Sequence, residues 1–274
     1  MSELAAVLIE GPSGWGEVTT PPPGYPVDPR AARRAAEEAG WGTWPSPRRQ
    51  RVVVNALVPA LAPEEAAAAA AGAVAEGFAC VKVKVGDDGS LDRVAAVRQA
   101  VGPGVAVRVD ANGAWDTDVA VARLRAMSSY DLELAEQPVA SLDDLARVRR
   151  RVPMPVAADE CVRDLDDAHA LARLDAADAL VVKVQPLGGV AAAMAVAEAA
   201  GVPAVVSSLY ETSVGIAAGL ALAAALPELP WACGLGTAVL LAGDVVTDPL
   251  VPVGGQLVVR RPVPDPVLLD RYEA

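Results

Sequence analysis

The alternation of short apolar runs with Ala-rich helical stretches between residues 52 and 236 constrains the fold most strongly. Pro63 and Ser141 are suitable residues to begin two of the intervening helices. Strands that alternate with helices form parallel βαβ units, and such a unit of about 25 residues repeated eight times is typical of a TIM-type barrel. We therefore expect an α/β fold, a TIM-type (β/α) barrel, with strands at 52–58, 80–85, 105–110, 132–136, 155–159, 179–184, 203–208 and 231–236.

A doubly wound open sheet is the alternative, but it more often carries a Gly-rich phosphate loop after its first strand, and none follows VVVNALVPALAPE (52–64). Residues 1–50 differ in pattern, with a hairpin expected in AVLIEGPSGWGE, then the Pro-rich TTPPPGYPVDP and a short helix. We expect a small α+β appendage over 1–50, the barrel with the active site over 51–245, and a C-terminal segment over 246–274 that returns to the appendage through the strand-like GGQLVVRR.

Two lysines, Lys82 and Lys84, lie inside the expected strand of FACVKVKVGDD (78–88). Residues two apart in a strand share a face, so the valines between them should pack against the helices. The lysines should then point into the barrel interior near its C-terminal mouth. Buried lysines are rare, and they need partners or a lowered pKa.

Partners recur at the same place in the following units. Asp110, Glu136, Asp159 and Lys183 end four successive strands, at intervals of 26, 23 and 24 residues. These residues should form an arc around the barrel mouth, where barrel enzymes keep their chemistry. Three carboxylates without His or Cys make a hard oxygen site that suits Mg²⁺. The alternative is that the charges only form structural salt bridges at strand ends.

The single histidine, His169, lies in a helical stretch without a ligand-spaced partner, so we expect a surface or packing role for it. The general base must then be a lysine or a free carboxylate. A lysine beside a second ammonium group and a metal ion has a lowered pKa, which suits removal of a proton next to a carboxylate.

The net charge of −12 argues against nucleic-acid binding and against binding to an anionic membrane surface. Cys80, Cys161 and Cys233 are far apart and have neither disulfide-framework nor zinc spacing, which fits a cytoplasmic protein. The longest uncharged apolar run, 214–226, has 13 residues and is too short to span a bilayer. The N-terminus lacks the basic region of a signal peptide.

The motifs VKVKV, VRVDANGAW, LAEQP, ADE and VVKVQPLGG, in this order, resemble the enolase superfamily and its muconate-lactonizing-enzyme-like subgroup. GPSGWGE (11–17), residues 205–237 and DVVTDPLVPVGGQL (244–257) are similar to the o-succinylbenzoate synthase family of actinobacterial type. The resemblance implies a hydro-lyase of menaquinone biosynthesis, which dehydrates 2-succinyl-6-hydroxy-2,4-cyclohexadiene-1-carboxylate with Mg²⁺. Its partner is a small-molecule carboxylate substrate.

The resemblance also implies residue roles. Lys84 would be the base, Lys82 would hold the substrate carboxylate, and Lys183 would stabilise the enediolate from the opposite face. Arg108 could instead be an interior salt-bridge partner, the serines could simply end a strand, and the role of Glu160 stays open. The remaining implied residues are Asp110, Glu136 and Asp159 for Mg²⁺, Arg108 and Asn112 in support of metal and substrate, and Ser207, Ser208 and the backbone of Gly234 and Leu235 at the succinyl end.

The resemblance implies a modified TIM-type (β/α)7β barrel with a small truncated N-terminal α+β capping domain over 1–50, to which the segment 246–274 returns. The family normally carries a larger capping domain, and residues 1–50 match only its later part. We expect weaker water exclusion and specificity as a result, unless the Pro-rich 20–29 stretch replaces the closing loop. N-succinylamino acid racemisation by Lys84 and Lys183 is a second possible activity. Dipeptide epimerases usually carry Asp-x-Asp at the eighth strand, where this chain has CGLGT. A binding protein without turnover is the third possibility.

Overall fold

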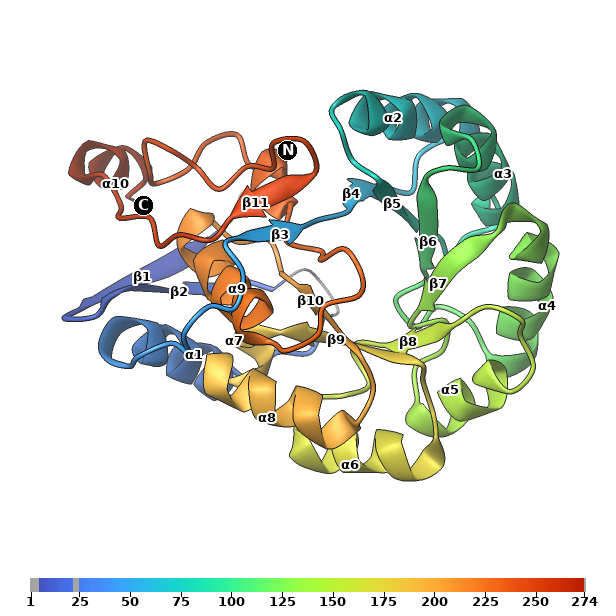
Figure 1. Ribbon diagram of the computed structural model, residues 1–274, viewed down its shortest axis with the longest axis horizontal. Coiled ribbons are helices and arrows are strands. Elements are labelled where there is room, and N and C mark those ends of the chain that lie inside the picture. The colour runs from blue at the N-terminus through green and yellow to red at the C-terminus, as the bar shows by residue number, and fades with distance from the viewer. Residues whose placement is uncertain (1–4, 22–24, 274) are drawn as a thin grey trace.

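The computed structural model describes residues 5–21 and 25–273, and its main feature is a curled sheet (Figure 1). Within these residues the sheet has seven strands, every neighbouring pair is parallel, and the spatial order follows the chain order. Valine and alanine dominate the strands, as suits a sheet buried on both faces. The strands are β4 (Ala56–Val58), β5 (Cys80–Lys84), β6 (Ala106–Asp110), β7 (Leu132–Glu136), β8 (Val156–Ala158), β9 (Ala179–Lys183) and β10 (Ala204–Ser207).

Helices cover the outside of this sheet (Figure 1). Pro63 is the first residue of its helix, and the Ser141 side chain accepts a hydrogen bond from Asp144 N, so both expected helix starts are confirmed. The helices are α2 (Pro63–Ala75), α3 (Ser90–Val101), α4 (Thr117–Met127), α5 (Leu142–Arg149), α6 (Leu165–Leu174), α7 (Val184–Leu187), α8 (Val190–Ala200) and α9 (Ser213–Ala225), with 3₁₀ turns η1 (Ser128–Tyr130) and η2 (Thr237–Leu240).

The barrel closes through residues 231–236, which do not form the regular eighth strand that the sequence predicts. Cys233 and Gly234 instead make isolated parallel bridges to Val54 and Ser207. Gly234 N donates to Val206 O at 2.8 Å, and Cys233 N donates to Val53 O at 2.8 Å. A side chain at Gly234 would collide with Ser207 Oγ, so this close approach requires glycine. We call this closure the seam.

The expected first strand, 52–58, is divided in two. Its first half is β3 (Arg51–Val53), which pairs antiparallel with β11 (Gln256–Val258), and only its second half, β4, joins the barrel sheet. Cys233 bridges to Val54 between the two halves, so the strand changes partners there. The strand expected in GGQLVVRR is confirmed by β11.

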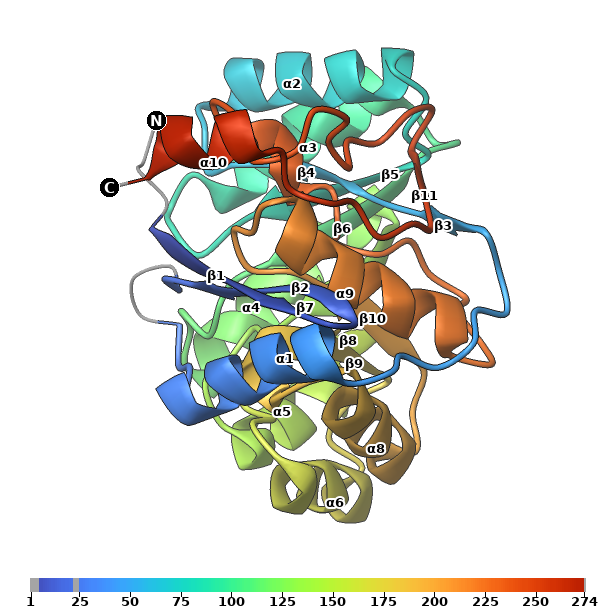
Figure 2. The same cartoon turned by 90° about the vertical axis from the view of Figure 1, so that its left-hand side faces the viewer.

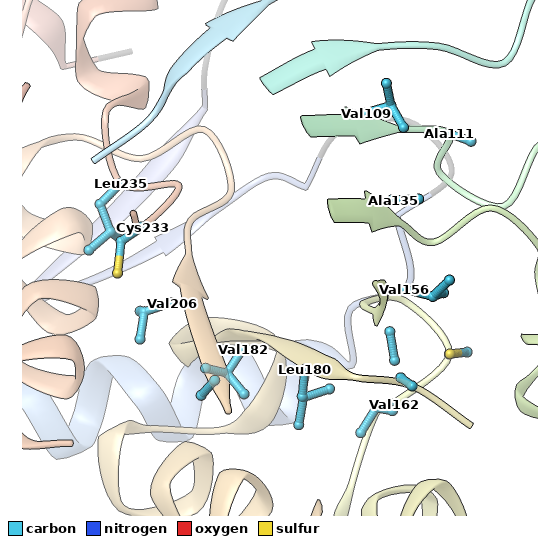
Figure 3. Close-up of a cluster of buried hydrophobic side chains, with 14 of the residues drawn as sticks. Val109, Ala111, Ala135, Val156, Val162, Leu180, Val182, Val206, Cys233 and Leu235 are labelled. Carbon is cyan, nitrogen blue, oxygen red and sulfur yellow. The ribbon is translucent and has the colours of Figure 1, made fainter. Parts of the chain in front are cut away.

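The main core lies between the sheet and the helices (Figure 3). Val81 and Val83 of β5 are fully buried in it, as the alternation with the two lysines predicts. The inside of the barrel is filled by a smaller apolar cluster of short side chains, Leu134, Ala157, Ala179, Val181 and Val205. This cluster forms the floor below the polar residues at the strand ends.

The N-terminal elements pack on one side of the barrel (Figure 2). The predicted hairpin is present as β1 (Ala6–Gly11) and β2 (Gly14–Thr19), and the predicted helix as α1 (Pro29–Trp41). Leu8 and Trp15 of the hairpin and Leu269 of α10 (Pro266–Tyr272) pack against the same small cluster of buried valines, so the chain's last helix and its first strands share one core.

Two glutamates of the N-terminal elements bind the N-termini of barrel helices. Glu17 of β2 accepts hydrogen bonds from Thr212 N at 3.0 Å, from Gly215 N at 2.9 Å and from the Thr212 hydroxyl. Glu38 of α1 accepts from Val190 N and from Ala191 N. These carboxylates satisfy free backbone donors at the starts of α9 and α8, and they attach the N-terminal elements to the barrel.

Candidate active site

A cavity of about 1100 Å³ opens at the carboxyl ends of the barrel strands. Its polar wall comes from the ends of β5, β6, β8 and β9, where barrel enzymes keep their chemistry. The structure therefore brings together most of the charged residues that the sequence singled out. Those lining the cavity are Lys82, Lys84, Asp110, Asp159 and Lys183.

The two lysines of β5 face the carboxylates of the next two strands. Lys84 lies opposite Asp110 in the strand register, and its ammonium group is 2.6 Å from Asp110 Oδ2. The Lys82 ammonium group bridges two carboxylates, at 3.1 Å from Asp110 Oδ2 and 2.8 Å from Glu136 Oε1. Glu136 is almost fully buried and does not line the cavity.

Lys183, at the end of β9, forms a second charged cluster across the cavity. Its ammonium group contacts both oxygens of Asp159, at 2.5 Å from Oδ1, and lies 3.1 Å from the Tyr25 hydroxyl oxygen. Tyr25 donates to Asp159 Oδ1 at 3.0 Å. Tyr25 belongs to the Pro-rich stretch, so a residue 134 positions from Asp159 completes this cluster.

Burial and neighbouring charges shift the pKa values of these groups in opposite directions. Burial raises the pKa of Glu136 to about 7, and the charge of Asp110 adds to the shift. Burial would also raise the pKa of Asp110, but Lys82 and Lys84 hold it below its usual value. The pKa of Lys82 is raised, because the attraction of Glu136 and Asp110 outweighs the effect of burial. Lys82 is therefore a permanent cation while these two carboxylates are its partners.

Asn112 and Glu160 extend the site at its rim. Asn112, with φ of 45°, accepts from the Lys84 ammonium group at 2.7 Å and donates to Glu160 Oε1 at 2.8 Å. An ammonium group can only donate and a carboxylate can only accept, so these two neighbours fix the orientation of the Asn112 amide. Glu160 Oε2 is buried without a hydrogen-bond partner among the described residues.

Gln137 is a polar residue of the site that the sequence did not single out. Its side-chain oxygen accepts from Asp159 N at 2.6 Å and contacts Cys161 Sγ at 3.3 Å, while its amide donates to Val139 O. Gln137 thus fixes the backbone that carries Asp159. Its position directly after the strand-end carboxylate Glu136 was the available signal.

Arg108 does not line the cavity. It lies two residues before Asp110, one layer deeper, where Nε is 2.5 Å from Glu133 Oε2 and Nη1 donates to Ala232 O at 2.7 Å. The structure thus places Arg108 in an interior ion pair, the alternative left open by the sequence, rather than at the mouth.

The expected residues for the succinyl end divide into two groups. Ser207, Ser208 and Gly234 line the cavity, and Ser208 Oγ donates to Gly234 O at 2.9 Å. Thr237 joins them with its hydroxyl 3.0 Å from Ser208 Oγ. The Leu235 side chain points away into the core (Figure 3), so only its backbone could face a ligand.

The donor set fits a hard divalent cation. Asp110, Glu136 and Asp159 are buried oxygen donors, and the Lys82 ammonium group already lies as a cation between two of them. Within residues 5–21 and 25–273, no three His, Cys, Asp or Glu side chains are drawn together as a metal site, because each carboxylate contacts a lysine instead. The three-carboxylate magnesium site stays a prediction.

The lysine content of the chain is concentrated entirely in this cavity. The sequence has three lysines, Lys82, Lys84 and Lys183, against 20 arginines, and all three line the cavity. The other cations of the surface are arginines. His169 is exposed on α6, and Cys80, Cys161 and Cys233 are buried free thiols. In the described part of the chain, no helix is long and apolar enough to cross a membrane.

Comparison with known proteins identifies the family. The family described as enolase C-terminal domain-like matches residues 65–264. The o-succinylbenzoate synthase of Thermobifida fusca (strain YX) is 52% identical over 263 residues, which cover 93% of this chain and 81% of that protein. The chain belongs to the o-succinylbenzoate synthase family. The member from Mycobacterium leprae (strain TN) is 44% identical over 96% of this chain and 79% of its own length.

Solved structures support the same superfamily and fold. This member of the o-succinylbenzoate synthase family is similar to the L-Ala-D/L-Glu epimerase of Bacillus subtilis, with a TM-score of 0.82 and 26% identity, over 95% of this chain and 89% of that one. Muconate lactonizing enzyme from Pseudomonas putida gives a TM-score of 0.86 at 21% identity, over 98% of both chains, and this likeness concerns the fold alone. The expected α/β barrel with a small N-terminal domain is confirmed.

Proposed function

We propose that this protein is a Mg²⁺-dependent o-succinylbenzoate synthase of menaquinone biosynthesis. It removes water from 2-succinyl-6-hydroxy-2,4-cyclohexadiene-1-carboxylate and forms o-succinylbenzoate. The observation that carries the proposal is the set of three lysines and three carboxylates at the ends of β5–β9, in a chain of the synthase family. Its three free cysteines fit a reducing cytoplasm.

Lys84 is the proposed base. As a neutral amine, it takes the proton from the carbon next to the substrate's ring carboxylate. It then returns this proton to the departing hydroxyl group, which leaves as water while the ring gains its third double bond. One group that acts first as base and then as acid would remove both substituents from one face of the ring. The hydrogen bonds of Lys84 to Asp110 and Asn112 fix the position of its side-chain nitrogen.

Lys183 and Lys82 supply the positive charge that the reacting carboxylate needs. Lys183 lies on β9, separated by three strands from Lys84 on β5, and so faces the substrate from the other side. Negative charge develops on the carboxylate oxygens as the proton leaves, and an ammonium group already in place stabilises it. Lys82 contributes a second fixed charge beside the base.

Asp110, Glu136 and Asp159 are the residues that would hold Mg²⁺, which when bound supplies Lewis acidity next to the substrate carboxylate. The formal charges favour this arrangement. With Glu160, four carboxylates surround three lysines, and only Lys82 and Lys183 are charged while Lys84 is the neutral base, so the site by itself carries an excess of negative charge. A substrate with two carboxylates is repelled by such a site unless a divalent cation offsets this charge.

The test is an absorbance assay with purified protein and the cyclohexadiene substrate, which follows formation of the aromatic product. We expect product formation with Mg²⁺ and its loss after chelation with EDTA, restored by added Mg²⁺. Catalysis that is unchanged after exhaustive chelation contradicts the metal assignment. Substrate binding without product formation would instead indicate a binding protein.

N-succinylamino acid racemisation is a second candidate, and the placement of Lys84 and Lys183 on opposite sides of one cavity favours it. Two lysines so placed can remove and return a proton on different faces of one carbon. The assay is loss of optical rotation of an N-succinylamino acid, with exchange of its α-proton in D₂O followed by NMR. An unexchanged α-proton excludes this activity.

A further inference from the structure

One side chain of the Pro-rich stretch, Tyr25, enters the cavity from outside the barrel. It is also the only aromatic residue of TTPPPGYPVDP (19–29). Its hydroxyl group reaches Asp159 and Lys183, which are 3% and 7% exposed.

The three groups form a closed triangle of hydrogen bonds. Lys183 directs its ammonium group at both Asp159 oxygens and at the Tyr25 oxygen, and Tyr25 donates its own proton to Asp159 Oδ1. The centre of the Tyr25 ring is 4.5 Å from the Lys183 nitrogen, within the range of a cation–π contact. One side chain therefore holds the ammonium group twice, through its oxygen and through its ring.

We propose that Tyr25 is a positioning residue that fixes the Lys183 ammonium group and covers it on the β8–β9 side of the cavity. This inference rests on the proposed function for its effect on catalysis, but not for the placement of Lys183. Tyr25 acts through Lys183 and does not itself take part in proton transfer.

The need for such a residue follows from the chemistry of the site. Lysine has a flexible four-carbon side chain, so its charged end is only as well placed as its partners make it. In the described residues, Asp159 is the only other group that the Lys183 ammonium group contacts by hydrogen bond or ion pair. If Asp159 also holds Mg²⁺, its oxygens are shared with the metal, and Tyr25 is then the one contact of the Lys183 ammonium group, among the described residues, that does not bind the metal. A small displacement of a catalytic group lowers the rate strongly.

The first experiment compares kinetics of the full chain with those of Tyr25→Phe. This variant keeps the ring and removes the hydroxyl group. We expect kcat to fall about tenfold to a hundredfold, the equivalent of a hydrogen bond to a charged group, while KM stays within about threefold. Tyr130→Phe in η1 is the matched control, because it makes the same change outside the cavity. It should leave both constants unchanged.

The second experiment measures the chemical reactivity of the Lys183 ammonium group directly and does not depend on catalytic turnover. The chain has only three lysines, so modification by acetic anhydride, followed by Arg-specific cleavage and mass spectrometry, reports on the cavity. Lys183 falls in the peptide 174–260, whereas Lys82 and Lys84 fall in 52–93. In Tyr25→Ala we expect Lys183 to be modified about tenfold faster, because an aromatic side chain that covers it is gone. The modification rates of Lys82 and Lys84 should stay within about twofold.

The two readouts separate the inference from the proposed function. Thermal unfolding first confirms that each variant is folded. If wild-type protein does not dehydrate the substrate, the proposed function fails, while faster modification of Lys183 alone still supports its placement by Tyr25. The inference is overturned if Lys183 is modified equally fast in wild type and Tyr25→Ala. It is also overturned if kcat of Tyr25→Phe equals that of an active wild type.

Discussion

Two regions of this molecule bury carboxylates, and they neutralise them by different means. At the barrel mouth, Asp110, Glu136 and Asp159 contact the ammonium ends of lysines. Where the N-terminal elements meet the barrel, the buried Glu17 and the half-buried Glu38 are instead bound by backbone N–H groups at helix starts. A lysine end can move and exchange its partner, whereas a backbone donor is fixed by its helix. The mouth is therefore suited to chemistry, and the interface to attachment.

Lys84→Ala gives the sharpest test of this distinction. We expect the dehydration rate to fall by at least about 10⁴-fold, because one residue serves as both base and acid. Mg²⁺ affinity, measured by calorimetry, and the unfolding midpoint should change little, since the removed cation serves chemistry rather than attachment. A variant within tenfold of wild-type activity contradicts the assignment of the base.

Glu17→Ala should have the opposite profile. It leaves the backbone donors at Thr212 and Gly215 buried without their acceptor, so we expect the free energy of unfolding to fall by about 2–4 kcal/mol. Urea denaturation measures this change. The control is Glu10→Ala, which removes an exposed carboxylate from the same hairpin and should cost less than about 0.5 kcal/mol. Equal losses in the two variants would show that Glu17 does not attach the hairpin.

The interface should also make stability depend on pH. Burial, followed by the charge of Glu17, raises the pKa of Glu211 to about 8 from 4.5. Between these values the folded state holds a proton that the unfolded state has released. The stabilising contribution is therefore complete below about pH 4.5 and is lost as pH rises through about 8.

Urea unfolding at pH 5.5 and pH 8.5 checks this sign. We expect wild-type stability to fall by about 3 kcal/mol more over this interval than the stability of Glu211→Gln, which has no proton to lose. A wild-type protein that becomes more stable with rising pH, relative to the variant, contradicts the burial of this carboxyl group.

The smallest expected effect concerns Glu160, which reaches Lys84 only through Asn112. Glu160→Ala should lower kcat about threefold to tenfold with KM unchanged, because the Asn112 amide loses one of the two neighbours that orient it. Glu160→Gln keeps an acceptor oxygen and should restore most of the activity. Glu198→Ala, an exposed change on α8, serves as control. If kcat of Glu160→Gln stays as low as that of Glu160→Ala, the effect comes from the negative charge of Glu160 and not from its hydrogen bond to Asn112.

The sequence predicted those parts of the structure that depend on local periodicity. Alternation with buried valines placed Lys82 and Lys84 on the inner face of β5, and regular spacing placed Asp110, Asp159 and Lys183 at the same mouth. The periodicity of a strand shows which face of the sheet a side chain lies on, but not how deep in the barrel it ends or which residue it binds there. Arg108 shares the face of Asp110, yet it lies one layer below and binds Glu133.

Contacts between distant parts of the chain could not be predicted in this way. Tyr25 meets Asp159 across 134 positions, and no local pattern marks that approach. The expected strand at 231–236 failed for a related reason. Its apolar residues suit a strand. In the fold, however, Gly234 passes close to Ser207, and the segment pairs with its two neighbours through one isolated bridge each.

The seam has a consequence for the motion of the barrel. Cys233 and Gly234 join their neighbours through isolated bridges, whereas β5 and β6 pair along five residues. Local opening begins where few bonds must break together, so deuterium should replace the amide protons of Cys233 and Gly234 well before those of β6. The barrel would thus open locally along the seam, where residues 231–236 separate from their neighbours. Because Ser207 and Gly234 also line the cavity, a ligand bound to both would hold the seam closed and slow this exchange.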